Sequence, residues 1–84
     1  MPHYVYILYS LTFDKFYIGS TSDTVEKRLH KHNSNHSGFT GRSTDWKLMY
    51  KEEYSDKMMA LKREKQIKAW KSRKRIEALV ISAK

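Results

Sequence analysis

The first twenty residues hold two short apolar stretches separated by a brief connection, and this feature constrains the fold most. HYVYILYS, residues 3–10, is rich in aromatic and β-branched side chains, and FYIGS, residues 16–20, has a similar composition. Such stretches are typical of β-strands, and LTFDK, residues 11–15, is short enough to be the turn between them. We therefore predict that the chain begins with an antiparallel β-hairpin.

The length of the hairpin loop decides whether Tyr6 and Tyr17 can meet. Side chains along a strand alternate between the two faces of a sheet. A connecting loop of two or four residues would place both tyrosines on the same face, whereas an odd loop without a bulge would place them on opposite faces. Because tyrosines are common in strands, the pair by itself does not distinguish a functional site from ordinary strand packing.

A helix is predicted after the hairpin, over residues 23–36, DTVEKRLHKHNSNH. Asp23 is a suitable N-cap, and Glu26 three positions later completes a capping-box pattern. Residues 37–42, SGFTGR, contain the other two glycines of the chain and are predicted to be a loop.

The second half of the chain is predicted to contain one more strand and two helices. In WKLMYKEEY, residues 46–54, apolar and aromatic residues alternate with charged ones, although Met49 interrupts the alternation. This pattern predicts a third strand with one solvent-exposed face. Helical patterns follow over residues 56–70 and over residues 72–82, where Ser72 can cap the second helix. The order ββαβαα predicts an α+β fold, in which helices flank a small three-stranded antiparallel sheet.

Size and charge narrow the functional classes. A chain of 84 residues is long enough for one domain, which would span residues 1–84. There are 17 lysines and arginines against 9 acidic residues, which gives a net charge of +8. An excess of this size favours a polyanionic partner such as DNA, although solubility alone is a simpler reason for it.

The sequence shows no targeting features. No window approaches the roughly 18 apolar residues of a membrane span, and the N-terminus lacks the basic and apolar regions of a signal peptide. No cysteine is present to form disulfides or a thiolate zinc site. We therefore expect a protein that has no membrane partner and acts in the cytoplasm.

Within the first predicted helix, Arg28, His32 and His36 are spaced four residues apart and share one face. A guanidinium can hold a phosphate through two parallel hydrogen bonds, and an imidazole can transfer a proton near neutral pH. Both groups would serve phosphodiester chemistry. A solvated basic face is the alternative interpretation of the segment KRLHKH.

Glu64 is predicted to lie on the packing side of its helix, on the stripe shared by Ala60 and Ile67. A carboxylate in that position is costly unless it is paired or coordinates a cation. Two interpretations follow. Glu64 either pairs with Arg28 or a lysine, or it holds a divalent ion such as Mg²⁺ or Mn²⁺, which keeps several waters and binds phosphate oxygens.

Basic residues are concentrated in the last two predicted helices, with eight of them between positions 62 and 75. We predict that this patch contacts the nucleic-acid backbone without reading its sequence. One residue of the first helix and one of the glycine-containing loop are added to it. The predicted nucleic-acid-binding residues are Lys31, Arg42, Lys62, Arg63, Lys65, Lys68, Lys71, Arg73, Lys74 and Arg75.

Taken together, these segments resemble the GIY-YIG nuclease superfamily. The resemblance is closest to its small single-domain bacterial members, which are similar to the N-terminal nuclease domain of the excinuclease ABC system. It implies a three-stranded antiparallel sheet flanked by helices, and an enzyme that cuts DNA with one divalent metal ion. The matching pieces are VYI at residues 5–7, YIG at 17–19, RLHKH at 28–32 and the glutamate of LKREKQIK at 61–68.

The resemblance also implies roles for particular residues. Tyr6 and Tyr17 would be the tyrosines of the family's two motifs, and Arg28 and His32 would be its helix arginine and histidine. Glu64 would hold Mg²⁺ or Mn²⁺ against the scissile phosphate, while Tyr17 helps to deprotonate the attacking water. Arg28 would stabilise charge on the phosphate oxygens. Tyr6 and His32 would orient water or relay protons.

The leading prediction is a metal-dependent endonuclease that hydrolyses phosphodiester bonds in DNA, including branched, damaged or single-stranded forms, with a role in DNA repair or processing. A basic nucleic-acid-binding module that keeps the fold without catalysis is the alternative, and a structural protein recruited by a partner is a third. Two departures from the family pattern bear on this choice. The first motif reads YVY at residues 4–6 instead of GIY, and no asparagine follows Asn35.

Overall fold

The structure is a computed structural model, and it describes residues 2–34 and 45–82. The order of elements is ββαβαα, as predicted, and the three strands form one antiparallel sheet with β1 in the centre. The elements are β1 (His3–Ser10), β2 (Lys15–Thr21), α1 (Val25–Ser34), β3 (Lys47–Tyr54), α2 (Lys57–Trp70) and α3 (Arg73–Ser82).

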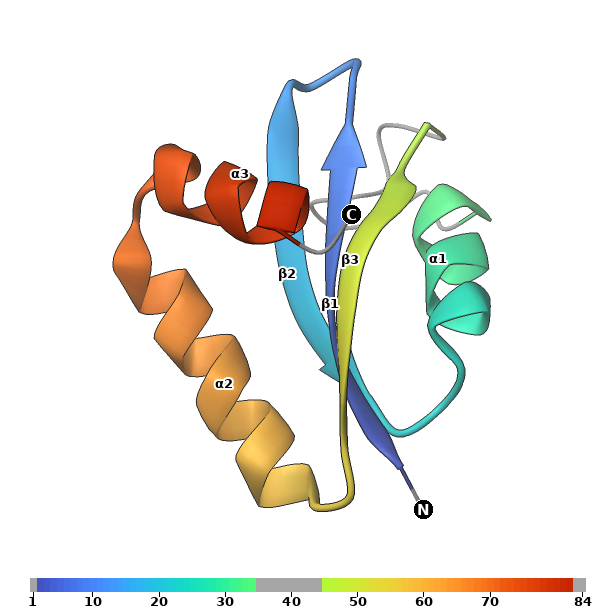
Figure 1. The fold of residues 1–84 in the computed structure, drawn as a ribbon. Coiled ribbons are helices and arrows are strands. Elements are labelled where there is room, and N and C mark those ends of the chain that lie inside the picture. The colour runs from blue at the N-terminus through green and yellow to red at the C-terminus, as the bar shows by residue number, and fades with distance from the viewer. Residues whose placement is uncertain (1, 35–44, 83–84) are drawn as a thin grey trace.

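The sheet separates two layers of helices (Figure 1). Helix α1 covers one face, where Tyr6, Leu8, Val25 and Trp46 form a buried cluster. Helices α2 and α3 cover the other face. The core on that side is larger and purely apolar, and it consists of Val5, Ile7, Ile18, Ala60, Ile67, Ile76 and Val80.

The hairpin has the even loop that places both tyrosines on one face. Ser10 pairs with Lys15, so the loop contains four residues, 11–14. Tyr6 then lies opposite Gly19, and Tyr17 lies opposite Leu8. Because residues 6 and 8 of a strand point to the same side, Tyr6 and Tyr17 share the face covered by α1.

Strand β3 contains a bulge where the sequence pattern was interrupted. Ile7 pairs with Tyr50 and Leu8 pairs with Leu48, which leaves Met49 as the extra residue. The prediction of a single apolar face for this strand is therefore wrong. The bulge reverses the alternation, so Leu48 packs on the α1 side while Tyr50 packs on the α2 and α3 side.

The caps of two helices agree with prediction and that of α1 does not. Asp56 caps α2 by accepting a hydrogen bond from the Met58 N–H at 3.0 Å. The Ser72 hydroxyl and carbonyl face the first turn of α3. At α1 the N-cap is Thr24, whose hydroxyl accepts from the Lys27 N–H at 3.2 Å. Asp23 lies one position too early and accepts from the Thr24 N–H instead.

None of the described helices has the length and apolar composition that crossing a membrane requires.

Candidate active site

Four of the predicted site residues come together on the α1 face of the sheet. The Tyr6 hydroxyl oxygen of β1 lies 3.2 Å from Nε2 of His32 in a hydrogen bond. The ring of Tyr17, on β2, stacks at a tilt on His32 with 4.6 Å between ring centroids. The two tyrosine rings are 6.4 Å apart. Arg28 lies one helical turn before His32 and completes the group.

Gly19 makes room for this arrangement. It lies opposite Tyr6 in the hairpin, and the Tyr6 ring folds over its backbone. A Cβ atom at Gly19 would be 2.6 Å from the Tyr6 hydroxyl oxygen and 3.1 Å from Cε1 of Tyr17. Any larger residue would therefore displace a tyrosine, which gives the glycine of the YIG segment a steric reason.

Helix α1 is held in place by contacts at both ends. Val25 is buried against the sheet, and Leu29 packs beside it. Near the other end, the Asn33 side chain donates to the Trp46 carbonyl at 3.0 Å and accepts from the Trp46 N–H at 2.9 Å. Asn33 thus ties α1 to the start of β3. Sequence reasoning missed this residue, because its partner is a backbone group 13 positions away.

Burial decides the protonation of the two hydrogen-bonded groups. Burial lowers the pKa of His32 below its ordinary value of 6.5, and the positive charges of Arg28 and Lys31 act in the same direction. Burial also raises the pKa of Tyr6 above 10.0, against the lowering effect of Arg28. Near pH 7, His32 is therefore neutral and Tyr6 keeps its proton.

Arg28 is the charged member of the cluster that faces outward. Its guanidinium is half-buried, and a hydrogen bond with Tyr6 raises its pKa further above 12.5. The Nε atom is buried and has no hydrogen-bond partner among the described residues. A buried donor of this kind is costly unless a ligand satisfies it. An anionic oxygen would do so with a charge-assisted bond.

Glu64 lies outside the cluster, on the opposite face of the sheet. Its carboxylate accepts from the Ser20 hydroxyl at 2.5 Å and from the Lys68 ammonium at 2.7 Å. The packing-side position predicted for it is correct, and the lysine is Lys68, one helical turn away. Ser20 follows Gly19 on the edge strand β2, so Glu64 approaches the tyrosines around that edge. Its negative charge contributes to the raised pKa of Tyr6.

The donor set at Glu64 fits one divalent ion held by a single carboxylate. Within residues 2–34 and 45–82, no group of three or more His, Asp or Glu side chains is placed to hold a metal. Mg²⁺ does not need such a group, since it keeps several waters and takes substrate phosphate oxygens as ligands. The Lys68 ammonium already supplies a positive charge at the carboxylate, so a cation is accommodated there.

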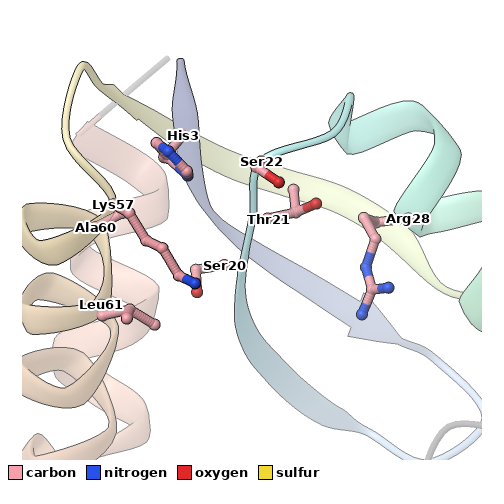
Figure 2. Close-up of a pocket in the computed structure, with 8 residues that line it drawn as sticks. All are labelled: His3, Ser20, Thr21, Ser22, Arg28, Lys57, Ala60 and Leu61. Atoms are coloured by element: carbon pink, nitrogen blue, oxygen red, sulfur yellow. The ribbon is translucent and has the colours of Figure 1, made fainter. Parts of the chain in front are cut away.

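A cleft of about 320 Å³ lies at the end of β2, between α1 and α2 (Figure 2). Arg28 lines one side of it and Lys57, from the first turn of α2, lines the other. Three hydroxyl side chains, Ser20, Thr21 and Ser22, lie between them. The cleft therefore joins the arginine of the cluster to the serine that contacts Glu64.

The predicted basic patch divides into paired and unpaired side chains. Arg63 donates to Glu52 at 3.0 Å, and Arg73 donates to the Asp14 carboxylate at 2.6 Å and to its carbonyl at 3.0 Å. With Lys68, three of the predicted phosphate-contacting residues are thus bound to carboxylates. Arg75 stacks on the ring of Trp70. The remaining described members, Lys31, Lys62, Lys65, Lys71 and Lys74, are exposed.

Two residues of the prediction lie outside the described part of the chain. They are His36, the third member of the helix-face pattern, and Arg42 of the loop.

Comparison with known proteins gives one match. The model of the GIY-YIG catalytic domain matches residues 2–77 of the chain. No curated protein sequence and no solved structure matches it significantly. The closer resemblance to the nuclease domain of the excinuclease ABC system therefore stays a prediction.

Proposed function

This chain belongs to the GIY-YIG family, whose domains are typically endonucleases, and on that basis we propose that it cuts DNA by divalent-metal-dependent hydrolysis of phosphodiester bonds. The observation that supports the proposal most is the convergence of Tyr6, Tyr17, Arg28 and His32 from three elements. Arg28 borders both this group and the open cleft.

Arg28 is proposed to bind the scissile phosphate. Its buried Nε has no partner among the described residues, and it is the charged side chain that links the tyrosine–histidine cluster to the cleft. A phosphate oxygen would satisfy that donor, and the interaction would strengthen as charge gathers on the phosphate in the transition state. Arg28 therefore serves catalysis rather than stability.

The tyrosines and His32 are proposed to handle the water and its proton. Neutral His32 accepts or donates a hydrogen bond to Tyr6 according to its tautomer, so the pair can pass a proton without a net change in charge. Tyr17 lies against His32 and takes the position nearest the edge strand. We assign to Tyr17 the orientation and deprotonation of the attacking water.

Glu64 is proposed to hold Mg²⁺ or Mn²⁺. When bound, such an ion supplies Lewis-acid stabilisation of the phosphate and lowers the pKa of bound water. For this chain the requirement is that Lys68 release the carboxylate, and the Lys68 side chain is 51% exposed, so it has room to turn towards solvent.

Plasmid nicking in Mg²⁺ and in Mn²⁺ tests this function. Wild type should convert supercoiled plasmid to the nicked form, while Glu64→Gln and Tyr17→Phe should lose most of the activity. Lys74→Gln, at an exposed site on α3, is the control for general effects of a substitution. Failure of the wild type in every metal, or equal cutting by both site variants, would reject the proposal.

The same assay separates the alternative, a binding module without catalysis. Retardation of DNA in a gel with no cleavage in any metal would favour that module. A series of substrates with nicked, branched, damaged and single-stranded DNA then ranks the forms proposed from the sequence.

A further inference from the structure

The cleft at the end of β2 is larger than the binding of one phosphate needs. Its volume of about 320 Å³ equals that of about ten water molecules at roughly 30 Å³ each. Arg28 occupies only one of its walls, and Figure 2 shows that the other wall, from α2, lies across the strand end. The cleft therefore has room for backbone beyond the phosphate bound by Arg28.

The charge in the cleft is positive from end to end. Arg28 and Lys57 are on opposite sides, and the described residues that line it include no carboxylate. Serine and threonine hydroxyls occupy the floor between the two cations. A cleft with two separated cations and neutral donors between them is complementary to two anionic groups joined by a short neutral linker.

Lys57 differs from several other cations of the same region. Arg63 and Lys68 of α2 are held by carboxylates. For Lys57 the structure gives neither an ion pair nor a hydrogen bond within its described part, and the adjacent Asp56 is engaged in capping the helix. In Figure 2 the Lys57 side chain extends from α2 towards Ser20. Its ammonium is thus available to a ligand in the cleft.

We propose that Lys57 binds a second phosphate of the same DNA strand, next to the scissile phosphate bound by Arg28. The inference rests on the proposed nuclease function and specifies how its substrate lies. One strand crosses the end of β2 from α1 to α2, and Ser22 supplies a hydroxyl donor to the backbone between the two phosphates. Because the contacts are to phosphate, this subsite fixes the position of the strand and does not select bases.

Single neutral phosphates in the substrate test the proposal. A set of oligonucleotides, each with one methylphosphonate near the cleavage site, is assayed for cleavage with wild type and with Lys57→Gln. Wild type should lose activity, by about tenfold, when the phosphate flanking the scissile one on one side is neutral. Lys57→Gln should show a similar loss on unmodified DNA and no further loss with that methylphosphonate.

Binding gives a second readout that does not depend on cleavage. In the Glu64→Gln background, Lys57→Gln should lower the slope of log K against log salt by about 0.7–0.9. Lys47→Gln is the matched control, since Lys47 is exposed at the opposite end of the sheet, where it pairs with Tyr9. It should leave the methylphosphonate profile unchanged.

The outcomes separate the two proposals. If wild type fails to cut any DNA, the nuclease function is rejected, and the binding profile alone decides the role of Lys57. If wild type cuts but Lys57→Gln keeps the same sensitivity to every methylphosphonate, the second phosphate subsite is rejected while the nuclease function stands.

Discussion

The two faces of the sheet use the same residue types for opposite purposes. On the α1 face, tyrosines and a histidine fill the space under the helix, and the Arg28 Nε lacks a partner among the described residues. On the α2 and α3 face the core is apolar, and Arg63 is held by Glu52, which also accepts from Tyr50 and from Tyr54. A paired arginine stabilises the fold, whereas an incompletely paired one is available to a ligand.

The difference teaches where this chain can tolerate cost. The α1 face carries buried polar groups and a buried donor without a described partner, which reduce stability. The opposite face supplies the apolar burial that offsets them. The two faces meet at the edge strand β2, where Gly19 supports the cluster and Ser20 binds Glu64.

The largest effect should come from the arginines, taken one from each face. Arg28→Ala should lower the rate of DNA cleavage by about 10²–10³-fold, because it removes charge stabilisation in the transition state. Its melting temperature should change little. Arg63→Ala should do the reverse, with a clear loss of stability and a nearly unchanged rate. Equal effects of both variants on the rate would erase the distinction between the faces.

Two buried aliphatic residues sharpen the comparison next. Ile67→Ala, in the α2 and α3 core, should lower the free energy of unfolding by about 2–5 kcal/mol and leave the rate per folded molecule intact. Leu8→Ala, which packs beneath Tyr6 and Trp46, should lower both stability and rate. Urea unfolding and cleavage assays well below the melting temperature measure the two quantities. A loss of rate in Ile67→Ala would contradict the division.

Gly19→Ala tests the steric support of the cluster. The added Cβ would displace the Tyr6 hydroxyl, at a cost of about 1–3 kcal/mol in stability. The misplaced tyrosine should lower the rate by up to about 10²-fold. NMR signals of the Tyr6, Tyr17 and His32 rings should shift in the variant. Unshifted ring signals would mean that the cluster does not depend on the glycine.

A smaller effect is expected where the two faces meet. Lys68→Gln removes the ammonium that now pairs with Glu64, so the affinity for Mn²⁺ should rise by about two- to fivefold. Isothermal titration of the protein without DNA measures it. Lys65→Gln, exposed on the same helix, is the control. Equal affinities in the two variants and the wild type would mean that Lys68 does not compete with the ion.

The smallest effect concerns the ion pair that ties the hairpin turn to α3. Arg73 and Tyr9 lower the pKa of Asp14 from 3.8 to about 2. The ionised carboxylate is thus favoured in the folded protein, so its contribution to stability is present above pH 3.8 and is lost as the pH falls through about 2. Melting temperatures between pH 5 and pH 2 should fall more steeply for wild type than for Arg73→Gln. Parallel curves would contradict this.

Local patterns in the chain predicted much of the fold. Alternating apolar residues, turn lengths and helix caps depend on near neighbours, and they predicted the element order, the shared face of Tyr6 and Tyr17 and the cap of α2 correctly. The one-turn spacing of Arg28 and His32 likewise placed both beside the tyrosines. Where local signals competed, the prediction failed, since Thr24 rather than Asp23 caps α1.

Other features depend on contacts between distant parts of the chain, and no local pattern contains them. The bulge at Met49 follows from the pairing of β3 with β1, and it moved Tyr50 to the other face. Arg73 was predicted to bind phosphate, but the fold brings it to Asp14, 59 positions away.

The sequence by itself determined which chemical groups this protein has and which of them lie on the same element, because spacing along a strand or helix dictates the face. Tertiary structure alone decided which charges are paired, that Glu64 reaches the site around the edge of β2, and that Arg28 and Lys57 line one cleft. Those outcomes depend on how helices pack across the sheet, and packing joins residues whose separation in the chain carries no information about their distance.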